Sequence, residues 1–287
     1  MNKIYTDSYF HIGEQHLATG LPNQDYALAG AEEGYAYAIV SDGCSSGGKT
    51  DVGSRILAHA TQRALRSAYI QGRVFDRMRA TRVRLETEAA IAASAQLLNL
   101  ALRDLLATLL YAVVGDAGGY IRVYGDGVVV VAYQDGSMTL RSFSWKDNMP
   151  FYLAYTNDAL ASFKEAHGND LWKMRLIEHV VHVQGDGVCE KHIEHTLAEG
   201  IYGIHLPVPR DEVSQVEYIA LFSDGVEQIE GELWVDAARE LMRYKIPKGV
   251  FVKRRMIRGL KEYRKKGKRN LDDIASAVIR LAHEEEE

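Results

Sequence analysis

Runs of apolar residues alternate along the chain with short polar or glycine-rich segments, and the clearest run lies near the N-terminus. Residues 35–40 have the length and composition of a buried strand, and the chain turns polar and glycine-rich at Ser41. Asp42 therefore stands where a strand ends and a loop begins. A carboxylate at such a point, followed by the permissive backbone of Gly43, can hold a metal ion or let the chain approach a phosphate closely.

The first part of the chain predicts strands followed by helices. Residues 7–13 predict a first strand and residues 16–22 a loop. Beyond the glycine loop, Asp51 is expected to cap a helix whose apolar positions recur at spacings of three and four. A second helix is expected at residues 83–102. Its apolar stripe consists of Leu85, Ala89, Ala92, Ala93, Leu97 and Leu100. Each helix has a single apolar face, so each is expected to lie on a sheet.

From residue 108 to residue 144 the pattern changes to short β-favouring runs separated by turn residues. These runs leave no room for crossover helices, so we expect antiparallel hairpins and exclude a purely parallel sheet. Residues 145–200 form a mixed region, with a helix expected near residues 159–165. A second apolar run ends in Ser-Asp-Gly at Asp224 and precedes two helical stretches. Residues 274–282 are expected to form a last strand.

Composition limits the class of protein. A chain of 287 residues with 47% apolar content can bury a large core, and no linker divides it, so we expect one domain over residues 1–287. The two cysteines, Cys44 and Cys189, are too few for a disulfide framework and suit a reducing compartment. No segment reaches the ~20 apolar residues that cross a bilayer, and no apolar signal region begins the chain. We therefore expect a soluble cytoplasmic protein with no membrane partner.

Charge is unevenly distributed along the chain. The formal net charge of -5 argues against a general nucleic-acid binder. Residues 248–270 nevertheless contain eleven lysine or arginine residues and one acid, Glu262. This basic segment either presents a solvated helical face or contacts a phosphorylated partner or an acidic surface, and the solvated face is the simpler interpretation.

Four aspartates share one feature, since each stands at the start or end of an apolar run. They are Asp25, Asp42, Asp224 and Asp272. Any one of them alone is readily explained as a turn or cap residue. Carboxylates at the ends of separate strands can converge, and converging carboxylates repel one another unless cations neutralise them. Because their oxygen ligands are hard, such a site selects Mg²⁺ or Mn²⁺ over zinc.

The order of the motifs along the chain carries more information than any one of them. The motifs are Asn23-Gln24-Asp25, Ser41-Asp42-Gly43, Tyr124-Gly125-Asp126-Gly127, Ser223-Asp224-Gly225 and Asp272-Asp273-Ile274. This order, which extends from Gly13 to about Ile279, resembles the metal-dependent protein phosphatases of type 2C, the PPM family, in its bacterial form. The resemblance implies an α+β fold, a four-layer α-β-β-α sandwich with two antiparallel sheets flanked by helices.

The resemblance also implies a site for two Mn²⁺ or Mg²⁺ ions between the sheets, and a role for each motif residue. Asp42 would bridge both ions, and Gly43 would offer its backbone carbonyl. Asp224 and Asp272 would complete the shell of one ion. Asp25 would hold metal-bound water.

The implied activity is that of a phosphoprotein phosphatase, which hydrolyses phosphoserine or phosphothreonine monoesters by attack of a water that bridges the metals. Asp126 matches a position that helps to hold a weaker third ion in bacterial members. The implied partners are a phosphorylated protein substrate and a cognate serine/threonine kinase.

Two departures from the family pattern concern the chemistry of the site. Many members carry an arginine shortly before the first acidic motif to bind the substrate phosphate, but this chain has no arginine before Arg55. His16 is the nearest candidate for that role. Cys44 occupies a position where animal members have a histidine. Bacterial members, like this chain, have no histidine there. The missing arginine motivates a second hypothesis, a catalytically weak or inactive phosphatase-like binding or scaffold module, although the full set of carboxylates counts against it.

A rival motif overlaps the first Ser-Asp-Gly ending. Residues 43–50 satisfy the P-loop pattern G-x-x-x-x-G-K-[ST] and lie between an expected strand and an expected helix. Asp42 would aim a carboxylate at such a phosphate-binding loop, and the hairpins expected at residues 108–144 do not suit a parallel P-loop sheet. A P-loop NTPase is therefore the less favoured hypothesis, and Lys49 is expected to be a solvated loop lysine.

Overall fold

Two antiparallel sheets lie face to face in the computed structural model, which describes residues 3–69 and 77–282. The larger sheet contains, in spatial order, β1 (Lys3–His11), β12 (Ile274–Ala282), β11 (Val216–Phe222), β6 (Gly127–Tyr133), β7 (Met138–Trp145), β8 (Met174–Gln184) and β9 (Gly187–Thr196). The smaller sheet contains β10 (Ile204–Val208), β5 (Gly118–Tyr124), β4 (Leu109–Gly115), β3 (Tyr35–Ser41) and β2 (Tyr26–Glu32).

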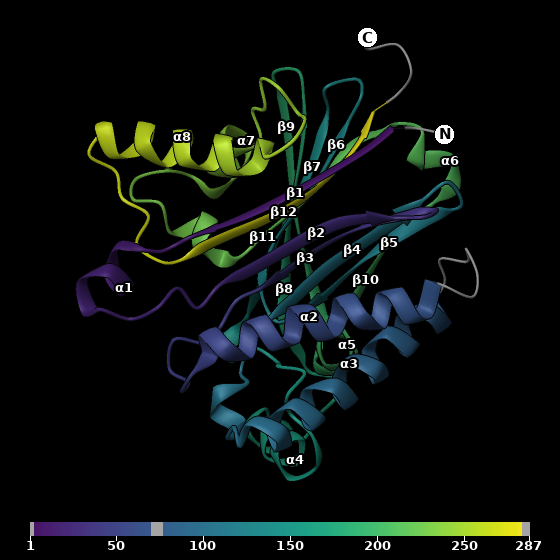
Figure 1. The fold of residues 1–287 in the computed structure, drawn as a ribbon, viewed down its shortest axis with the longest axis vertical. Coiled ribbons are helices and arrows are strands. Elements are labelled where there is room, and N and C mark those ends of the chain that lie inside the picture. Colours follow the sequence, from purple (N-terminus) through teal and green to yellow (C-terminus); the bar gives the residue numbers. More distant parts are fainter. Residues whose placement is uncertain (1–2, 70–76, 283–287) are drawn as a thin grey trace.

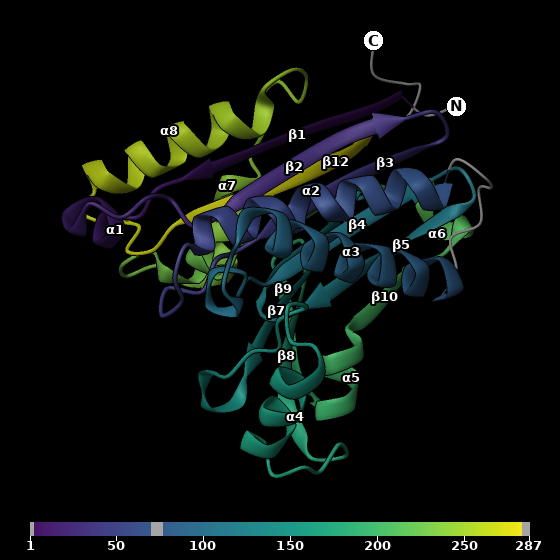
Figure 2. The same ribbon diagram turned by 60° about the horizontal axis from the view of Figure 1, so that its bottom comes forward.

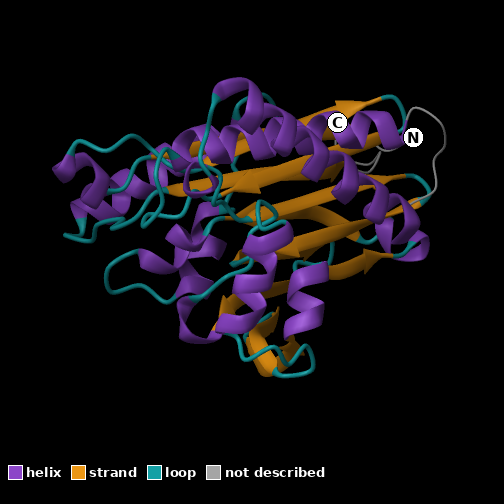
Figure 3. Ribbon diagram, turned by 90° about the horizontal axis from the view of Figure 1, so that it is seen from below, coloured by secondary structure: helices purple, strands orange, loops and turns teal. Residues whose placement is uncertain are grey.

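Helices cover the outer faces of both sheets (Figure 1). The helices of the described residues are α1 (Glu14–Thr19), α2 (Thr50–Tyr69), α3 (Arg77–Leu98), α4 (Asn157–Ala166), α5 (Leu197–Tyr202), α6 (Arg210–Val213), α7 (Trp234–Leu241) and α8 (Phe251–Lys265). The pair α7 and α8 covers the larger sheet, while α2 lies on the smaller one and α3 packs along α2 (Figure 1). Seen from below, helices lie in front of the strands (Figure 3). The predicted four-layer α-β-β-α sandwich is confirmed. Within the described residues, no helix is long and apolar enough to span a membrane.

Two apolar clusters hold these layers together. One fills the space between the sheets and continues outward to α2 and α3, and the other lies between the larger sheet, α7 and α8. The apolar run at residues 35–40 forms most of β3, and every residue of that strand is buried. It is continuously apolar because α2 covers one of its faces and the larger sheet covers the other.

The four runs expected between residues 108 and 144 form two hairpins in different sheets. β4 pairs with β5 in the smaller sheet, and β6 pairs with β7 in the larger one. β5 and β6 do not pair, because the chain crosses between the sheets at Gly125, Asp126 and Gly127. Both glycines have positive φ, at 93° and 130°, a conformation that glycine adopts without strain. The crossover therefore places Asp126 between the sheets.

Two expectations for local structure were wrong. Residues 16–22, expected to be a loop, include most of the short helix α1. The mixed region at residues 145–200 contains the expected helix as α4, but it also contains the β8–β9 hairpin, which the sequence pattern did not predict. β9 is the edge strand of its sheet and is mostly exposed, so its residues lack the alternation that marks a half-buried strand.

The predicted ends and apolar stripes of the two long helices also need correction. α2 begins at Thr50, so Asp51 lies in its first turn and is not its cap. The buried residues of α3 are Ala80, Val83, Thr87 and Ile91. In the predicted stripe, by contrast, Leu85 and Leu97 are 59% and 84% exposed. The reason is that α3 packs mainly along α2 (Figure 2), so its buried face is set by that helix rather than by a sheet.

This correction predicts opposite outcomes for two truncations on α3. Ile91→Ala removes a side chain that is 5% exposed, so the free energy of unfolding should fall by about 2–4 kcal/mol. Leu97→Ala, on the predicted stripe, should change it by less than about 0.5 kcal/mol. Urea denaturation followed by circular dichroism measures both. A larger effect at residue 97 than at residue 91 would contradict the assigned packing face.

Candidate metal centre

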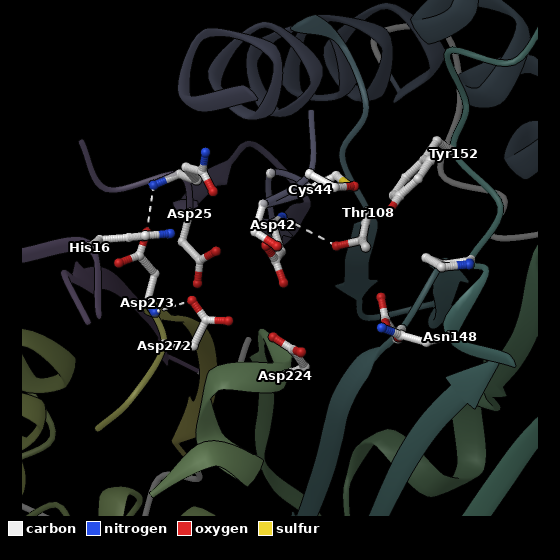
Figure 4. A pocket seen from close by; sticks show the side chains of 16 residues that line it. His16, Asp25, Asp42, Cys44, Thr108, Asn148, Tyr152, Asp224, Asp272 and Asp273 are labelled. Atoms are coloured by element: carbon white, nitrogen blue, oxygen red, sulfur yellow. Dashed lines mark hydrogen bonds and ion pairs between the residues drawn. The ribbon is translucent and has the colours of Figure 1, made fainter. Parts of the chain in front are cut away.

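A cavity of about 210 Å³ gathers every aspartate that the sequence singled out. Its acidic lining residues are Asp25, Asp42, Asp126, Asp224, Asp272 and Asp273, and Gly43 lines it as well. Asp25, Asp42, Asp224 and Asp272 point toward one another in Figure 4. The structure therefore brings together all six residues proposed as metal ligands, although they come from segments that are far apart in the sequence.

Antiparallel pairing explains this convergence. β2 begins and β3 ends at the same edge of the smaller sheet, where Tyr26 pairs with Ser41, so Asp25 and Asp42 leave that edge side by side. In the larger sheet β11 ends where β12 begins, which places Asp224 near the Asp272 segment. Because the sheets lie face to face, the two pairs of carboxylates meet across the space between them.

Removal from water and mutual repulsion raise the pKa values of four of these carboxyl groups, those of Asp25, Asp42, Asp126 and Asp224. For Asp25 burial is the main cause of the raised pKa, and the charges of Asp273 and Asp224 add to it. For Asp42 burial again comes first, followed by the charges of Asp25 and Asp224. Burial raises the pKa of Asp126 to about 7, with a further contribution from Asp224. Proton uptake and cation binding are the two ways to relieve such repulsion.

The donor set fits hard divalent cations. Among the described residues no lysine or arginine lines the cavity, so no side chain of fixed positive charge neutralises the carboxylates there. Carboxylate and backbone carbonyl oxygens are the ligands that Mg²⁺ and Mn²⁺ prefer. Cys44 and His16 are the cysteine and histidine that line the cavity in the described part of the chain, and they lie on separate walls, an arrangement that does not suit a zinc site.

Neutral donors outside the carboxylate group fix its orientation. The Ser223 hydroxyl donates to Asp25 Oδ2 at 2.5 Å. Gln228 Nε2 donates both to Asp224 Oδ2 at 3.0 Å and to Asp272 Oδ2 at 3.2 Å. Such partners hold ligands in place before a metal binds. The sequence analysis missed Ser223 and Gln228 as supporting residues, although Ser223 belongs to the Ser-Asp-Gly motif.

Asp273 differs from the other acids, because backbone amides satisfy it. Its Oδ1 accepts the N–H of Gly13 at 2.7 Å, and its Oδ2 accepts the N–H of Gln24 at 2.6 Å. His16 Nδ1 lies 2.8 Å from the same Oδ2. The ligand atoms of His16, Asp272 and Asp273 all lie within 4.8 Å of one another. Asp273 therefore ties the segments around residues 13 and 24 to the start of β12, a role that its sequence position did not reveal.

His16 lies in the wall of the cavity and is only 7% exposed. It lies on α1 rather than in a loop, and it contacts Asp273. Its role as a phosphate ligand stays a prediction. Arg55, the first arginine of the chain, is not available for that role, because its guanidinium stacks over the rings of Phe10 and Tyr26 at 5.6 and 5.1 Å.

A close approach of two backbones explains the glycine of the second Ser-Asp-Gly motif. A Cβ atom at Gly225 would lie 1.8 Å from the carbonyl oxygen of Asp273, which no side chain tolerates. The same segment also approaches Gly13, where a Cβ atom would lie 2.3 Å from the carbonyl carbon of Asp272. Both glycines therefore let the Asp272–Asp273 pair sit deep between β11 and α1.

Comparison with known proteins agrees with this geometry. The sequence model of the family described as protein phosphatase 2C matches residues 12–274. The chain belongs to the protein phosphatase 2C family. The family and the function class inferred from the motifs, protein serine/threonine phosphatase, are thereby confirmed. A search of curated proteins finds no match.

Solved structures of similar fold include several bacterial phosphatases. The serine/threonine phosphatase Stp1 from Staphylococcus aureus is 10% identical, with a TM-score of 0.54 and coverage of 99% of this chain and 96% of that chain. The serine/threonine phosphatase PstP/Ppp of Mycobacterium tuberculosis is 17% identical, with a TM-score of 0.50 and coverage of 98% and 99%. A bacterial serine phosphatase is 10% identical, with a TM-score of 0.55 and coverage of 99% and 100%. At these identities the likeness shows the fold.

The loop that matches a P-loop in sequence does not form one in this protein phosphatase 2C member. A P-loop directs its backbone N–H groups at an anion, but here Cys44 N–H donates to the Leu106 carbonyl and Gly48 N–H to the Arg103 carbonyl. Lys49 N–H donates to Asp104 Oδ1 at 2.9 Å, and the Lys49 side chain is exposed. Together with the antiparallel sheet, these bonds argue against the NTPase hypothesis.

The raised pKa of Asp42 predicts that one substitution separates stability from metal binding. At neutral pH an acid whose pKa is higher in the folded chain favours the unfolded state, so Asp42→Asn should leave the metal-free chain equally or more stable. The same variant should lose the stabilisation that Mn²⁺ gives the wild type, about 2.7 kcal/mol at a hundredfold excess over Kd. Thermal melts with Mn²⁺ and with EDTA measure both effects.

The matched control is Asp236→Asn, an exposed aspartate on α7. It should respond to Mn²⁺ as the wild type does. An Asp42→Asn variant that keeps the full Mn²⁺-dependent rise in melting temperature would show that Asp42 does not hold the ions.

Proposed function

We propose that this chain is an active metal-dependent protein phosphatase that hydrolyses phosphoserine and phosphothreonine monoesters. The observation that carries the proposal is the convergence of six carboxylates in one cavity that no lysine or arginine of the described residues lines. A scaffold that only binds phosphoproteins gains nothing from gathering repelling carboxylates away from water, at a cost to its stability. The inactive-module hypothesis therefore has no structural feature in its favour.

We propose two Mn²⁺ or Mg²⁺ ions and a weaker third as cofactors. Asp42 suits a bridging role, because it interacts with both Asp25 and Asp224. Gly43, Asp224 and Asp272 would complete the main sites, while Asp126, on the crossover between the sheets, would help to hold the third ion. When bound, such ions supply a nucleophile at neutral pH and positive charge opposite the phosphoryl oxygens.

The side chains of the chain itself position the reactants. The Asp25 carboxylate accepts the Ser223 hydroxyl at Oδ2 and also interacts with Asp42, and in this position it would hold and orient the attacking water. The same hydrogen bond fixes the rotation of the Asp25 carboxylate, which points toward the other aspartates of the cavity (Figure 4). Fixed orientation of this kind lowers the entropic part of the barrier.

Recognition of the phosphate group in this chain would rest on hydrogen-bond donors other than arginine. Ser45, Ser46 and Asn148 line the cavity and are exposed, whereas His16 lies deeper in its wall. We propose His16 and these exposed donors as the phosphate ligands in place of an arginine. The partners we propose are a phosphorylated protein substrate and a cognate serine/threonine kinase, in a reducing compartment that suits the two free cysteines.

Hydrolysis of a phosphothreonine peptide and of p-nitrophenyl phosphate, beside hydrolysis of ATP, tests the proposal. Both phosphate esters should be hydrolysed with Mn²⁺ or Mg²⁺ and not with EDTA. Asp224→Ala should lower kcat/KM by about a thousandfold or more, that is at least ~4 kcal/mol of barrier. Lys49→Ala should change it by less than about tenfold, because this lysine is exposed.

Two results would contradict the proposal in different ways. Absence of turnover with every metal, together with retained phosphopeptide binding, would support the scaffold hypothesis. A Lys49→Ala variant as impaired as Asp224→Ala, in a protein that hydrolyses ATP faster than the monoester, would restore the P-loop hypothesis.

The crossover position of Asp126 predicts a partial defect. Asp126→Ala should lower turnover by roughly tenfold while two tight metal sites remain, because Asp42 and Asp224 still hold the main pair. Calorimetric titration with Mn²⁺ counts the tight sites. Loss of both tight sites in this variant would show that Asp126 anchors the main pair.

A further inference from the structure

A second and larger cavity, of about 950 Å³, lies away from the carboxylates. Residues of α3, β5, α5 and β10 form its walls, and it shares no lining residue with the carboxylate cavity. α3 and α5 approach each other here, since Arg84 Nη1 donates to the Ile201 carbonyl at 2.8 Å (Figure 2). Its volume falls within the range of pockets that bind small molecules, about 300–1,000 Å³.

The main polar group in this cavity is a buried arginine of the smaller sheet. Arg122 lies on β5 between Tyr111 of β4 and His205 of β10, and it is only 9% exposed. Its Nη2 donates to the Tyr124 hydroxyl at 3.1 Å and to the Tyr202 carbonyl. Its Nε–H has no hydrogen-bond partner among the residues that the structure describes. Within residues 3–69 and 77–282 no carboxylate forms an ion pair with Arg122.

A buried guanidinium without an anion is costly, because charge removed from water is normally compensated by an opposite charge. The other charges of the cavity do not supply it. Glu88 pairs with Arg84 at 2.6 Å, and Glu199 lies 3.7 Å from His195. Arg77 is exposed and, in the described part of the chain, forms no ion pair. An excess of positive charge therefore faces the cavity.

His205, the neighbour of Arg122 on β10, lies in the same positive potential. The pKa of His205 is lowered to about 4, first by burial and then by the charges of Arg122 and Arg77. His205 is therefore neutral at physiological pH, and its ring stacks on Tyr120 with the centroids 5.3 Å apart. Neutral His205 adds a flat ring to the cavity without adding charge.

Large apolar side chains at the rim of the cavity are exposed to an unusual extent. Trp172 is 79% exposed, Tyr202 66% and Leu85 59%, and all three line it. Aromatic groups in such positions offer flat surfaces for a ring of the ligand. The Arg84 guanidinium stacks over Tyr202 at 5.7 Å, which holds that ring at the rim.

We propose that this cavity binds a small organic anion, with a carboxylate or phosphate group paired to Arg122 and an aromatic body packed against Trp172 and Tyr202. The ligand is small because Arg122 lines a cavity and is only 9% exposed, so a flat macromolecular surface does not reach its guanidinium. The anionic group satisfies the free Nε–H through a charge-assisted hydrogen bond. This proposal does not depend on the phosphatase activity.

A pair of matched fluorescent probes tests the proposal on the full-length chain with Mn²⁺. The anion 8-anilinonaphthalene-1-sulfonate should bind at least about tenfold more tightly than N-phenyl-1-naphthylamine, which has the same aromatic body without the charge. Arg122→Met should weaken binding of the sulfonate by about tenfold or more and leave the neutral probe unaffected. Trp172→Ala should weaken binding of both.

Controls separate the site from general effects on folding. Arg63→Met, an exposed arginine on α2, should change neither affinity. If Arg122→Met does not fold by circular dichroism, the exposed Arg77→Met takes its place and should weaken the sulfonate selectively. Competition by 1-naphthoate and by naphthalene-1-phosphonate then distinguishes a carboxylate site from a phosphate site.

Three results would overturn the proposal. One is equal affinity for the charged and neutral probes. Another is unchanged sulfonate binding in both the arginine variant tested, Arg122→Met or Arg77→Met, and Trp172→Ala. The third is the absence of binding by any of the four compounds.

Discussion

Mutual repulsion between carboxylates in one small cavity is the constraint on which the rest of the structure depends. Antiparallel pairing brings the start of β2 and the end of β3 to one edge, and it does the same for β11 and β12 in the facing sheet. The aspartates at these four strand ends therefore lie close together in one cavity between the sheets. Because this arrangement raises the pKa values of Asp25, Asp42 and Asp224, the free energy that holds the carboxylates together must come from the packing of the two sheets.

Asp272 and Asp273, which are adjacent at the start of β12, have different roles. Asp273 also lines the cavity, but its carboxylate accepts the backbone N–H groups of Gly13 and Gln24. Asp272 faces the cavity and shares the Gln228 amide with Asp224. One residue thus fixes three chain segments, and the other remains available as a ligand. This division requires the close backbone contacts that only glycine permits next to the pair.

The strand-end aspartates could be predicted because their signal is local: a buried apolar run followed by an acid marks the edge of a sheet, as at β3 and Asp42. The four-layer fold could be predicted only from the order of several motifs. The role of Asp273 in joining distant segments could not be predicted, since the backbone groups that it binds lie about 250 residues away along the chain. The buried face of α3 and the β8–β9 hairpin were also out of reach, because a neighbouring helix and an exposed sheet edge, rather than local periodicity, determine them.

A crystal structure of the Mn²⁺-loaded protein, with anomalous scattering recorded at the manganese edge, tests the central claim most directly. The account predicts two strong anomalous peaks between the sheets, both within bonding distance of an Asp42 oxygen, with Asp224 and Asp272 around one of them. A weaker peak beside Asp126 is expected at higher Mn²⁺ concentration. Absence of anomalous density in this cavity at saturating Mn²⁺, or peaks bound only elsewhere on the surface, would contradict the account.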